Sequence, residues 1–282
     1  MAGASAIRAL PNFGGRLGEA SLPRLFSGAG LWLRSGVAGR SLHGIVKLAE
    51  LYFWRDSDFR SPAANMALDE ALFHWSSAEG RAVARFYQWE GPAVTAGYFD
   101  RSAKATESLS DSPPTRRFTG GGLVEHGEDL TFLLTLPAGS TAARASGMAR
   151  YRWIHEAVAD ALLTAAYRVT LLSGEANSLT GPCFANPVPW DLLDPLTGIK
   201  IGGGAQRRSR GAIIHQGSIR LPELLRNPEA PWITNLLEHL ADTPLPLDEE
   251  VREKARSLSN DLEKTRYGNP LWNGGALSKR EN

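Results

Sequence analysis

Two glycine triplets, each close to basic residues, are the feature that most restricts how this 282-residue chain can fold. The first, at residues 120–122, follows Arg116 and Arg117, and the second, at residues 202–204, follows Lys200. Glycine weakens a strand, so a triplet is favoured where a ligand or another backbone packs against the bare main chain. Basic side chains there can pair with phosphate or carboxyl oxygens. Either segment alone is more typical of a turn or an exposed strand edge, but the two together favour a binding site.

Composition, charge and motifs exclude several classes of protein. Lys and Arg number 31 against 30 acidic residues, and the resulting charge of +1 gives no overall field to attract nucleic acid or an anionic membrane. No stretch approaches the roughly 18 apolar residues of a membrane span. A single cysteine excludes an intrachain disulfide and a thiolate metal cluster, and no histidine pair has metal-ligand spacing, so no metal site is expected. The first triplet is not a Walker loop, because no Gly-Lys-Ser/Thr follows it, and it is not a dinucleotide fingerprint either.

The basic residues are concentrated at the start of the chain. Residues 1–47 are rich in Gly, Ala and Arg and carry +5, because five Arg and one Lys stand against Glu19, which leaves −4 for residues 48–282. A disordered tail or upstream DNA translated from a misplaced start is favoured over an organelle transit peptide. The reason is that Met1 does not open a strong amphipathic helix.

The remaining chain is expected to form one folded domain with a short C-terminal addition. We predict the domain at residues 48–245, and a charged helix followed by a loose tail at residues 246–282, with the loose end starting at Gly268. A cytoplasmic location is expected, or an organelle location if the basic tail is a transit peptide.

Apolar periodicity predicts strands interrupted by two long helices. Strands are predicted at residues 51–54, 82–89, 93–98, 131–136, 169–172, 190–193, 199–205 and 212–221. Amphipathic helices are predicted after Ser61, which can cap Pro62, and from Ile154 onward. Short turns join the last three strands and require antiparallel neighbours. The pattern indicates an α+β fold with mixed, mostly antiparallel sheets and helices packed over one face.

Three further side chains are candidates for chemistry. Cys183 lies in a Gly-Pro-Cys-Phe loop 17 residues before Lys200, and a nearby ammonium favours the thiolate, which is the reactive form. The alternative for Cys183 is a buried small side chain. His126 and His215 are more typical of hydrogen-bonding structural residues than of general bases.

The ordered motifs resemble those of the biotin/lipoate protein ligase superfamily, the group of lipoate-protein ligase A and the octanoyltransferases. One motif is Arg-Arg-Phe-Thr-Gly-Gly-Gly at residues 116–122 with His126, and the other is Gly-Ile-Lys-Ile-Gly-Gly-Gly-Ala-Gln at residues 198–206. Two further segments fit the same pattern, residues 65–70 and 215–219. The resemblance extends over about residues 51–240 and implies a single class II synthetase-like catalytic domain.

The resemblance implies transfer of an octanoyl or lipoyl group to a lysine of a small lipoyl domain. In the ligases, the arginine and glycine segment holds an acyl-adenylate, and the lysine that corresponds to Lys200 contacts the acyl carbonyl and the phosphate. In the ligase-like octanoyltransferases, a cysteine placed like Cys183 accepts the acyl chain as a thioester. The residues implied to be catalytic are Cys183 and Lys200. The residues implied to bind the acyl group or adenylate are Arg116, Arg117, Thr119, Gly120, Gly121, Gly122, Leu123, Val124, His126, Gly202, Gly203, Ala205 and His215.

Within the family, the sequence favours the transferase over the ligase. Little chain follows residue 240, which is too little for the accessory domain of long single-chain lipoate ligases, although some ligases keep that domain on another chain. One departure from the family is Gly204, because the family usually has Ser at this position. Without the serine side chain, one contact to an oxygen is expected to be looser.

Each reading implies different partners and cofactors. The transferase needs a donor protein that carries an octanoyl or lipoyl group and a lipoyl-domain acceptor, with no cofactor. The runner-up, a lipoate-protein ligase, needs ATP and Mg²⁺, and biotin ligation comes third. From another class, the chain could be a non-catalytic acyl-binding protein. No reading calls for nucleic acid or a membrane.

Overall fold

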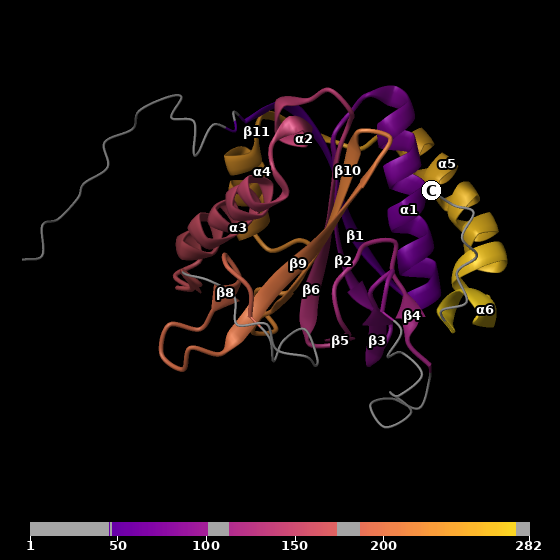
Figure 1. Cartoon of the computed structure of the whole chain (residues 1–282). Coiled ribbons are helices and arrows are strands. Elements are labelled where there is room, and N and C mark those ends of the chain that lie inside the picture. Colours follow the sequence, from indigo (N-terminus) through magenta and orange to yellow (C-terminus); the bar gives the residue numbers. More distant parts are fainter. Residues whose placement is uncertain (1–44, 46, 101–112, 174–186, 275–282) are drawn as a thin grey trace, which may run out of the picture. The chain divides into compact units, whose positions relative to one another are not determined.

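The computed structural model describes residues 45, 47–100, 113–173 and 187–274 (Figure 1). The large sheet contains β1 (Leu48–Arg60), β2 (Val83–Trp89), β6 (Asp129–Leu136), β7 (Thr170–Leu171), β8 (Leu192–Leu193), β9 (Lys200–Ser209), β10 (Ala212–Arg220) and β11 (Ala241–Pro246). A small sheet contains β3 (Ala93–Ala96), β4 (Thr115–Arg116) and β5 (Val124–His126). The helices are α1 (Pro62–Glu79), α2 (Thr141–Arg144), α3 (Gly147–Thr164), α4 (Trp232–Leu240), α5 (Glu249–Leu262) and α6 (Pro270–Asn273), with a π-helical turn, η3 (Glu263–Tyr267). None of these helices is long and apolar enough to cross a bilayer.

The strands of the large sheet run in the order β11-β1-β2-β6-β10-β9-β8-β7. β1 is parallel to β11 and to β2, and each later neighbour is antiparallel. β9 and β10 form the hairpin that the short intervening turn predicted, with Ala212 opposite Ser209 and Ile219 opposite Gly202. The predicted α+β class with mostly antiparallel strands is confirmed.

Helices cover both faces of the large sheet, whereas the sequence predicted that they cover one. Phe132 and Leu134 of β6 pack in a cluster with residues of α3 and α4, while Leu133 packs in a second cluster with residues of α1 and α5. Figure 1 accordingly shows α3 and α4 on one side of the sheet and α1 and α5 on the other. Every residue of β6 is buried, because a central strand between two helical layers has no solvent face.

Helix α1 starts where the sequence predicted, but it is not a surface helix. The Ser61 hydroxyl accepts the Ala64 N–H at 3.2 Å, and Pro62 occupies the first helical position. Residues 65–73 are all buried, since α1 lies between the sheet and the helices α5 and η3. The acidic side chains on this part of α1 therefore have to find partners inside the protein.

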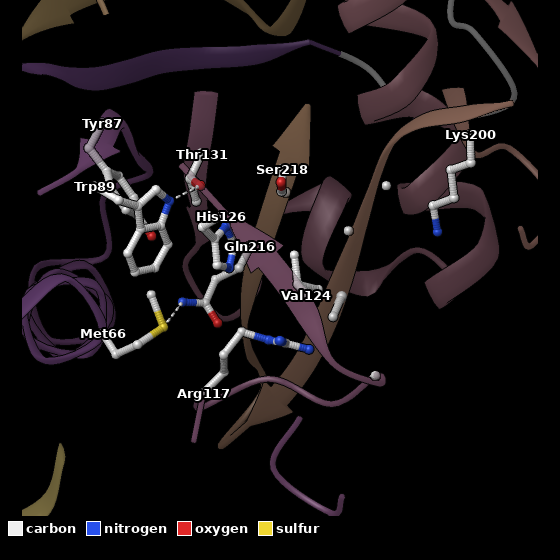
Figure 2. A pocket seen from close by; sticks show the side chains of 15 residues that line it. Met66, Tyr87, Trp89, Arg117, Val124, His126, Thr131, Lys200, Gln216 and Ser218 are labelled. Carbon is white, nitrogen blue, oxygen red and sulfur yellow. Dashed lines mark hydrogen bonds between the residues drawn. The ribbon is translucent and has the colours of Figure 1, made fainter. Parts of the chain in front are cut away.

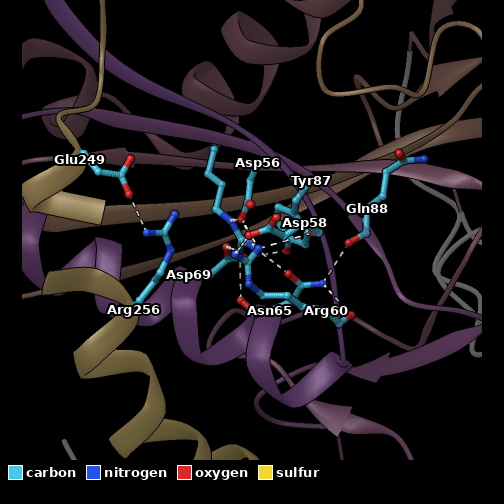
Figure 3. A network of polar contacts seen from close by, with 10 residues as sticks. Asp56, Asp58, Arg60, Asn65, Asp69, Tyr87, Gln88, Glu249 and Arg256 are labelled. Atoms are coloured by element: carbon cyan, nitrogen blue, oxygen red, sulfur yellow. Dashed lines mark hydrogen bonds and ion pairs between the residues drawn. The ribbon is translucent and has the colours of Figure 1, made fainter. Parts of the chain in front are cut away.

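A fully buried arginine on β2, Arg85, joins three elements. Figure 3 shows its partners Asp56, Asn65, Asp69 and Tyr87 close together. Arg85 contacts Asp56 of β1 and Asp69 of α1, each at 2.8 Å, and donates to the Asn65 side-chain oxygen at 2.6 Å. Its guanidinium also lies 3.9 Å from the centre of the Tyr87 ring. Each buried charge is therefore paired, and the pairs fix α1 on the sheet.

The C-terminal part contains structure that the sequence did not predict. β11 pairs with β1 at the sheet edge although it contains Pro244 and Pro246, which an edge strand tolerates. The predicted loose end from Gly268 is wrong for residues 268–274, because α6 forms there and the Trp272 side chain is buried. The Trp272 indole donates to the Arg116 carbonyl at 3.1 Å. Residues 275–282 lie outside the described part.

We predict that Arg85→Met destabilises the protein by about 3–5 kcal/mol, because Asp56 and Asp69 are left buried without their cation. The measurement is the free energy of unfolding from urea denaturation. Lys254→Met is the matched control, since Lys254 pairs with Glu250 at the exposed surface of α5 and its loss should barely move the midpoint. Equal midpoints for the two variants would contradict this account of the core.

Candidate functional site

A pocket lies between the small sheet and strands β9 and β10 of the large sheet (Figure 2). Its apolar lining comes from Met66, Tyr87, Trp89 and Val124. Its polar lining comes from Arg117, His126, Thr131, Lys200, Gln216 and Ser218. Bare or nearly bare backbone contributes at Gly121, Gly203, Gly204, Ala205 and Gly217. Figure 2 shows Lys200 at one end and the rings of Tyr87 and Trp89 at the other, so an elongated ligand could extend from the ammonium to the aromatic end.

The Lys200 ammonium is buried and held by a carboxylate. Its side chain is 2% exposed, and Nζ lies 2.7 Å from Asp191 Oδ2. A Cβ atom at Gly203 would lie 2.7 Å from Lys200 Cε and 2.8 Å from Asp191 Oδ1. Position 203 therefore has no room for a side chain while this ion pair is in place.

Asp191 is itself held from two sides. The Tyr151 hydroxyl on α3 donates to Asp191 Oδ1 at 2.5 Å, and the Val188 N–H donates to Oδ2 at 2.7 Å. The Tyr151 oxygen also accepts the N–H of Gly204 at 2.9 Å. This chain of contacts fixes the carboxylate, and with it the lysine, against the backbone of β9.

Arg117 and Gly97 determine the shape of the first glycine triplet. Arg117 Nη2 donates to the carbonyls of Gly120 and Gly122, both at 2.9 Å, and Nη1 donates to the Thr95 hydroxyl at 2.8 Å. A Cβ atom at Gly97 would lie 1.8 Å from the carbonyl oxygen of Gly121, so only glycine fits at position 97. The Arg117 guanidinium thus stabilises the conformation of the glycine loop through its backbone carbonyls.

His126 belongs to a polar network beside the apolar end of the pocket. His126 Nδ1 lies 2.8 Å from Asp129 Oδ2, Nε2 lies 2.8 Å from the Thr95 hydroxyl, and the Trp89 ring stacks on the imidazole at 4.1 Å. Asp129 Oδ2 also accepts the Ser218 hydroxyl at 2.6 Å. Both ring nitrogens of His126 are engaged, which suits a histidine that orients neighbours.

The carboxyl group of Asp129 is held ionised by these contacts. Burial alone would raise its pKa, but the His126 charge and the hydrogen bonds from His126, Ser218 and Gly127 hold the pKa at about 2. Since a depressed pKa stabilises the folded state above the ordinary value of 3.8, this contribution is lost as the pH falls toward 2.

Gln216 connects the pocket to the charged core. Its Nε2 donates to Asp69 at 2.7 Å, and its Oε1 accepts the Thr119 hydroxyl at 2.7 Å. Asp69 is the same carboxylate that pairs with Arg85. The network that fixes α1 on the sheet therefore also fixes the segment that leads into the first glycine triplet.

The structure brings about half of the predicted site residues into the pocket. The predicted residues that line it are Arg117, Gly121, Val124, His126, Lys200, Gly203 and Ala205. The predicted residues that do not line it are Arg116, Thr119, Gly120, Gly122, Leu123, Gly202 and His215. Cys183 lies outside the described residues.

Two of the residues outside the pocket have evident structural contacts. The Arg116 guanidinium donates to the carbonyls of Trp272 at 2.8 Å and of Gly97 and Tyr98 at 2.9 Å, which ties α6 to the small sheet. Leu123 packs in a small cluster with Val94. Neither side chain turns toward the pocket lining.

His215 lies on the opposite face of β10. Its ring packs 5.5 Å from Phe132 and 5.7 Å from His155, and neither ring nitrogen has a hydrogen-bond partner in the described part of the chain. Burial, together with the charges of His155 and Arg150, lowers the pKa of His215 well below its usual range. A Cβ atom at Gly204 would lie 2.6 Å from His215 Nε2, so the glycine at this position matches the close approach of the imidazole.

Although the sequence analysis named the segments 65–70 and 215–219 as part of the family pattern, it did not propose several residues that build the pocket as site residues. They are Met66, Tyr87, Trp89, Thr131, Tyr151, Asp191, Gln216, Gly217 and Ser218. Tyr87 and Trp89 are two residues apart on one strand, and Asp191 is an acid in an apolar run, which are the signals that could have indicated them. In the described ranges no group of three His, Cys, Asp or Glu side chains could hold a metal ion.

Comparison with known proteins places the motifs in a family. Residues 61–228 match the family described as the lipoyl protein ligase A/B catalytic domain. The chain is 33% identical over 174 residues to octanoyltransferase LipM of an Exiguobacterium species, a match that covers 57% of this chain and 62% of that protein. It is 32% identical over 211 residues to octanoyltransferase LipM of Bacillus cereus, which covers 70% of this chain and 71% of that protein. The match thus spans less than two thirds of the length of the first relative.

Solved structures show the same fold. A lipoate-protein ligase A bound with ATP superposes with a TM-score of 0.60 at 19% identity, covering 82% of this chain and all of that chain. The bipartite lipoate protein ligase of Thermoplasma acidophilum, studied with its E2 lipoyl domain, gives a TM-score of 0.59 at 20% identity, covering 84% of this chain and 99% of that chain. These matches confirm the fold that the motifs implied.

We predict a specific pH dependence for Asp129→Asn. Above about pH 4 the variant should be less stable than the parent, because it lacks the ionised carboxylate that His126 and Ser218 stabilise. Between pH 4 and pH 2 the difference should shrink by about 2 kcal/mol, as the parent carboxyl becomes protonated. Urea denaturation at several pH values measures both free energies, and a difference that stays constant over this range would refute the assignment.

Proposed function

This chain belongs to the lipoyl protein ligase A/B catalytic domain family, and on that basis we propose that it transfers an octanoyl or lipoyl group to a lysine of a lipoyl-domain carrier protein. The observation that carries the proposal is the buried Lys200 ammonium, paired with Asp191 at 2.7 Å, at one end of a pocket whose other end is aromatic. The octanoyltransferase LipM relatives support the octanoyl group as substrate. The bipartite ligase studied with its E2 lipoyl domain supports a lipoyl domain as acceptor.

The pocket offers suitable contacts for both parts of an acyl thioester. Each CH₂ group buried against Tyr87, Trp89 and Val124 contributes about 0.8 kcal/mol to binding. The Lys200 ammonium can bind the carbonyl oxygen at the other end of the chain and stabilise the negative charge that develops on it. The bare backbone at Gly203 and Gly204 allows the carbonyl to approach β9 closely.

In the first step of the proposed reaction, the Cys183 thiolate attacks the carbonyl carbon of the donor thioester. The carbonyl oxygen becomes an oxyanion that Lys200 stabilises, and the donor sulfur then leaves as a thiolate and takes up a proton. The product is an acyl group joined to Cys183 through a new thioester. We propose that the Lys200 ammonium also favours the ionised form of the Cys183 thiol.

In the second step, the neutral amine of the acceptor lysine attacks the Cys183 thioester. An amide bond forms, the C–S bond breaks, the nitrogen loses a proton and the Cys183 thiolate is restored. A thioester already carries the free energy that amide formation requires, so the transferase needs no ATP, metal or other cofactor.

We predict that mixing the protein with an octanoyl carrier protein adds the mass of one octanoyl group. The added group should be released by hydroxylamine, which cleaves thioesters, and should be absent from Cys183→Ala. Intact-mass spectrometry makes the measurement. Modification of a lipoyl domain only when lipoate and magnesium ATP are supplied would favour the ligase instead, and binding without any acyl transfer would favour a non-catalytic protein.

A second prediction concerns Lys200. In the double variant Lys200→Met/Asp191→Asn both charges of the buried pair are removed together, so no unpaired charge remains to unfold the domain. The rate of acyl-enzyme formation should fall by about 10²–10³-fold, because the oxyanion loses its cation. Stopped reactions analysed by mass give the rate, and unfolding in urea verifies the fold. A rate within threefold of the parent would remove Lys200 from the mechanism.

A further inference from the structure

Four arginines gather where α2, the start of α3 and the β9–β10 turn meet. They are Arg144, Arg150, Arg208 and Arg210. Arg144, Arg208 and Arg210 are exposed, and none of the four forms an ion pair with an acidic residue in the described ranges. The positive charge of this arginine cluster is therefore not neutralised by the described part of the protein.

Backbone carbonyl groups hold the cluster in place. Arg150 Nη1 and Arg208 Nη2 both donate to the Ala143 carbonyl, at 3.2 and 2.6 Å, and Arg150 also donates to Ala145. Arg144 donates to the carbonyl of Gly139. Burial and the charge of Arg208 lower the pKa of Arg150 to about 10. Like charges held this close favour an anionic partner.

The arginine cluster and the pocket share strand β9, on opposite faces. Ala205 lines the pocket, and Arg207 follows two residues later on the same face, with its guanidinium 4.0 Å from the Tyr98 ring and 4.1 Å from the Phe118 ring. Arg208 lies on the opposite face of β9 from Ala205, where it meets α2, and Arg210 lies in the turn at the end of the hairpin. Both are roughly 10–16 Å along the chain from Ala205, at about 3.3 Å per residue. A partner bound at the β9–β10 turn would therefore contact the exposed arginines within this distance of the pocket.

We propose that the arginine cluster docks the acidic surface of the carrier protein that donates the acyl thioester. The inference rests on the proposed function, because it assumes a protein-borne donor. A folded partner with carboxylates fits better than nucleic acid or a membrane, since three exposed arginines make a local patch and the whole chain carries only +1.

The test variant is Arg208→Gln/Arg210→Asn. Glutamine keeps a donor near the Ala143 carbonyl, and asparagine suits position 210, where the backbone has a positive φ of 48°. The control is Arg81→Gln/Arg168→Gln, which removes two exposed charges elsewhere. Arg168 follows the far end of the 18-residue α3, roughly 27 Å from its start. Both variants carry the same net charge.

We expect KM for the octanoyl carrier protein to rise at least fivefold in the test variant and less than twofold in the control. With octanoyl-pantetheine, an uncharged small thioester, kcat/KM should be the same for the test variant and the control variant. KM of the parent should rise with salt from about 50 to 300 mM, and that of the test variant should rise less steeply. KM for the lipoyl-domain acceptor should not change.

Fluorescence anisotropy with the carrier lacking its acyl group measures docking separately from catalysis. Weaker binding by the test variant than by the control supports the docking proposal, whether or not acyl transfer is seen. Absence of acyl transfer would reject the proposed function and leave the docking proposal in place. Equal affinities of the two variants, an equal loss with octanoyl-pantetheine, or an effect confined to the acceptor would overturn the docking proposal.

Discussion

The burial of one lysine ammonium next to a glycine backbone is the constraint on which the pocket depends. A buried charge is tolerated only when a partner replaces its water, and for Lys200 that partner is Asp191 at 2.7 Å. The carboxylate in turn requires the Tyr151 hydroxyl, and the ion pair leaves no room for a Cβ atom at Gly203. The need to pair one buried ammonium thus accounts for Tyr151 on α3, Asp191 before β8 and Gly203 on β9.

The two glycine triplets serve different physical purposes, which their similar composition conceals. The first is a loop whose carbonyls are held by Arg117 and which approaches Gly97 so closely that no side chain fits there. The second lies within a strand, where bare backbone accommodates Lys200 on one face and His215 on the other. Arginine beside a triplet therefore need not bind a ligand directly.

The sequence predicted most strands and both long helices because their apolar periodicity is local, and the β9–β10 hairpin because its turn is short. It predicted the pocket only in part, since motif proximity cannot distinguish the two faces of a strand. His215 and Gln216 are adjacent in sequence, yet Gln216 lines the pocket and His215 packs against Phe132 on the opposite face of the sheet. Asp191 depends on tertiary contacts with Tyr151 and Lys200 that no local pattern encodes.

The C-terminal segment is part of the pocket's support even though it lies beyond the two motifs. Tyr267 and Trp272 pack in the same cluster as Met66, Tyr87 and Trp89, and the latter three line the apolar end of the pocket. The order of these rings therefore depends on η3 and α6. A boundary at residue 245 would separate the apolar wall from the residues that pack behind it, so the functional unit of this chain extends at least to α6.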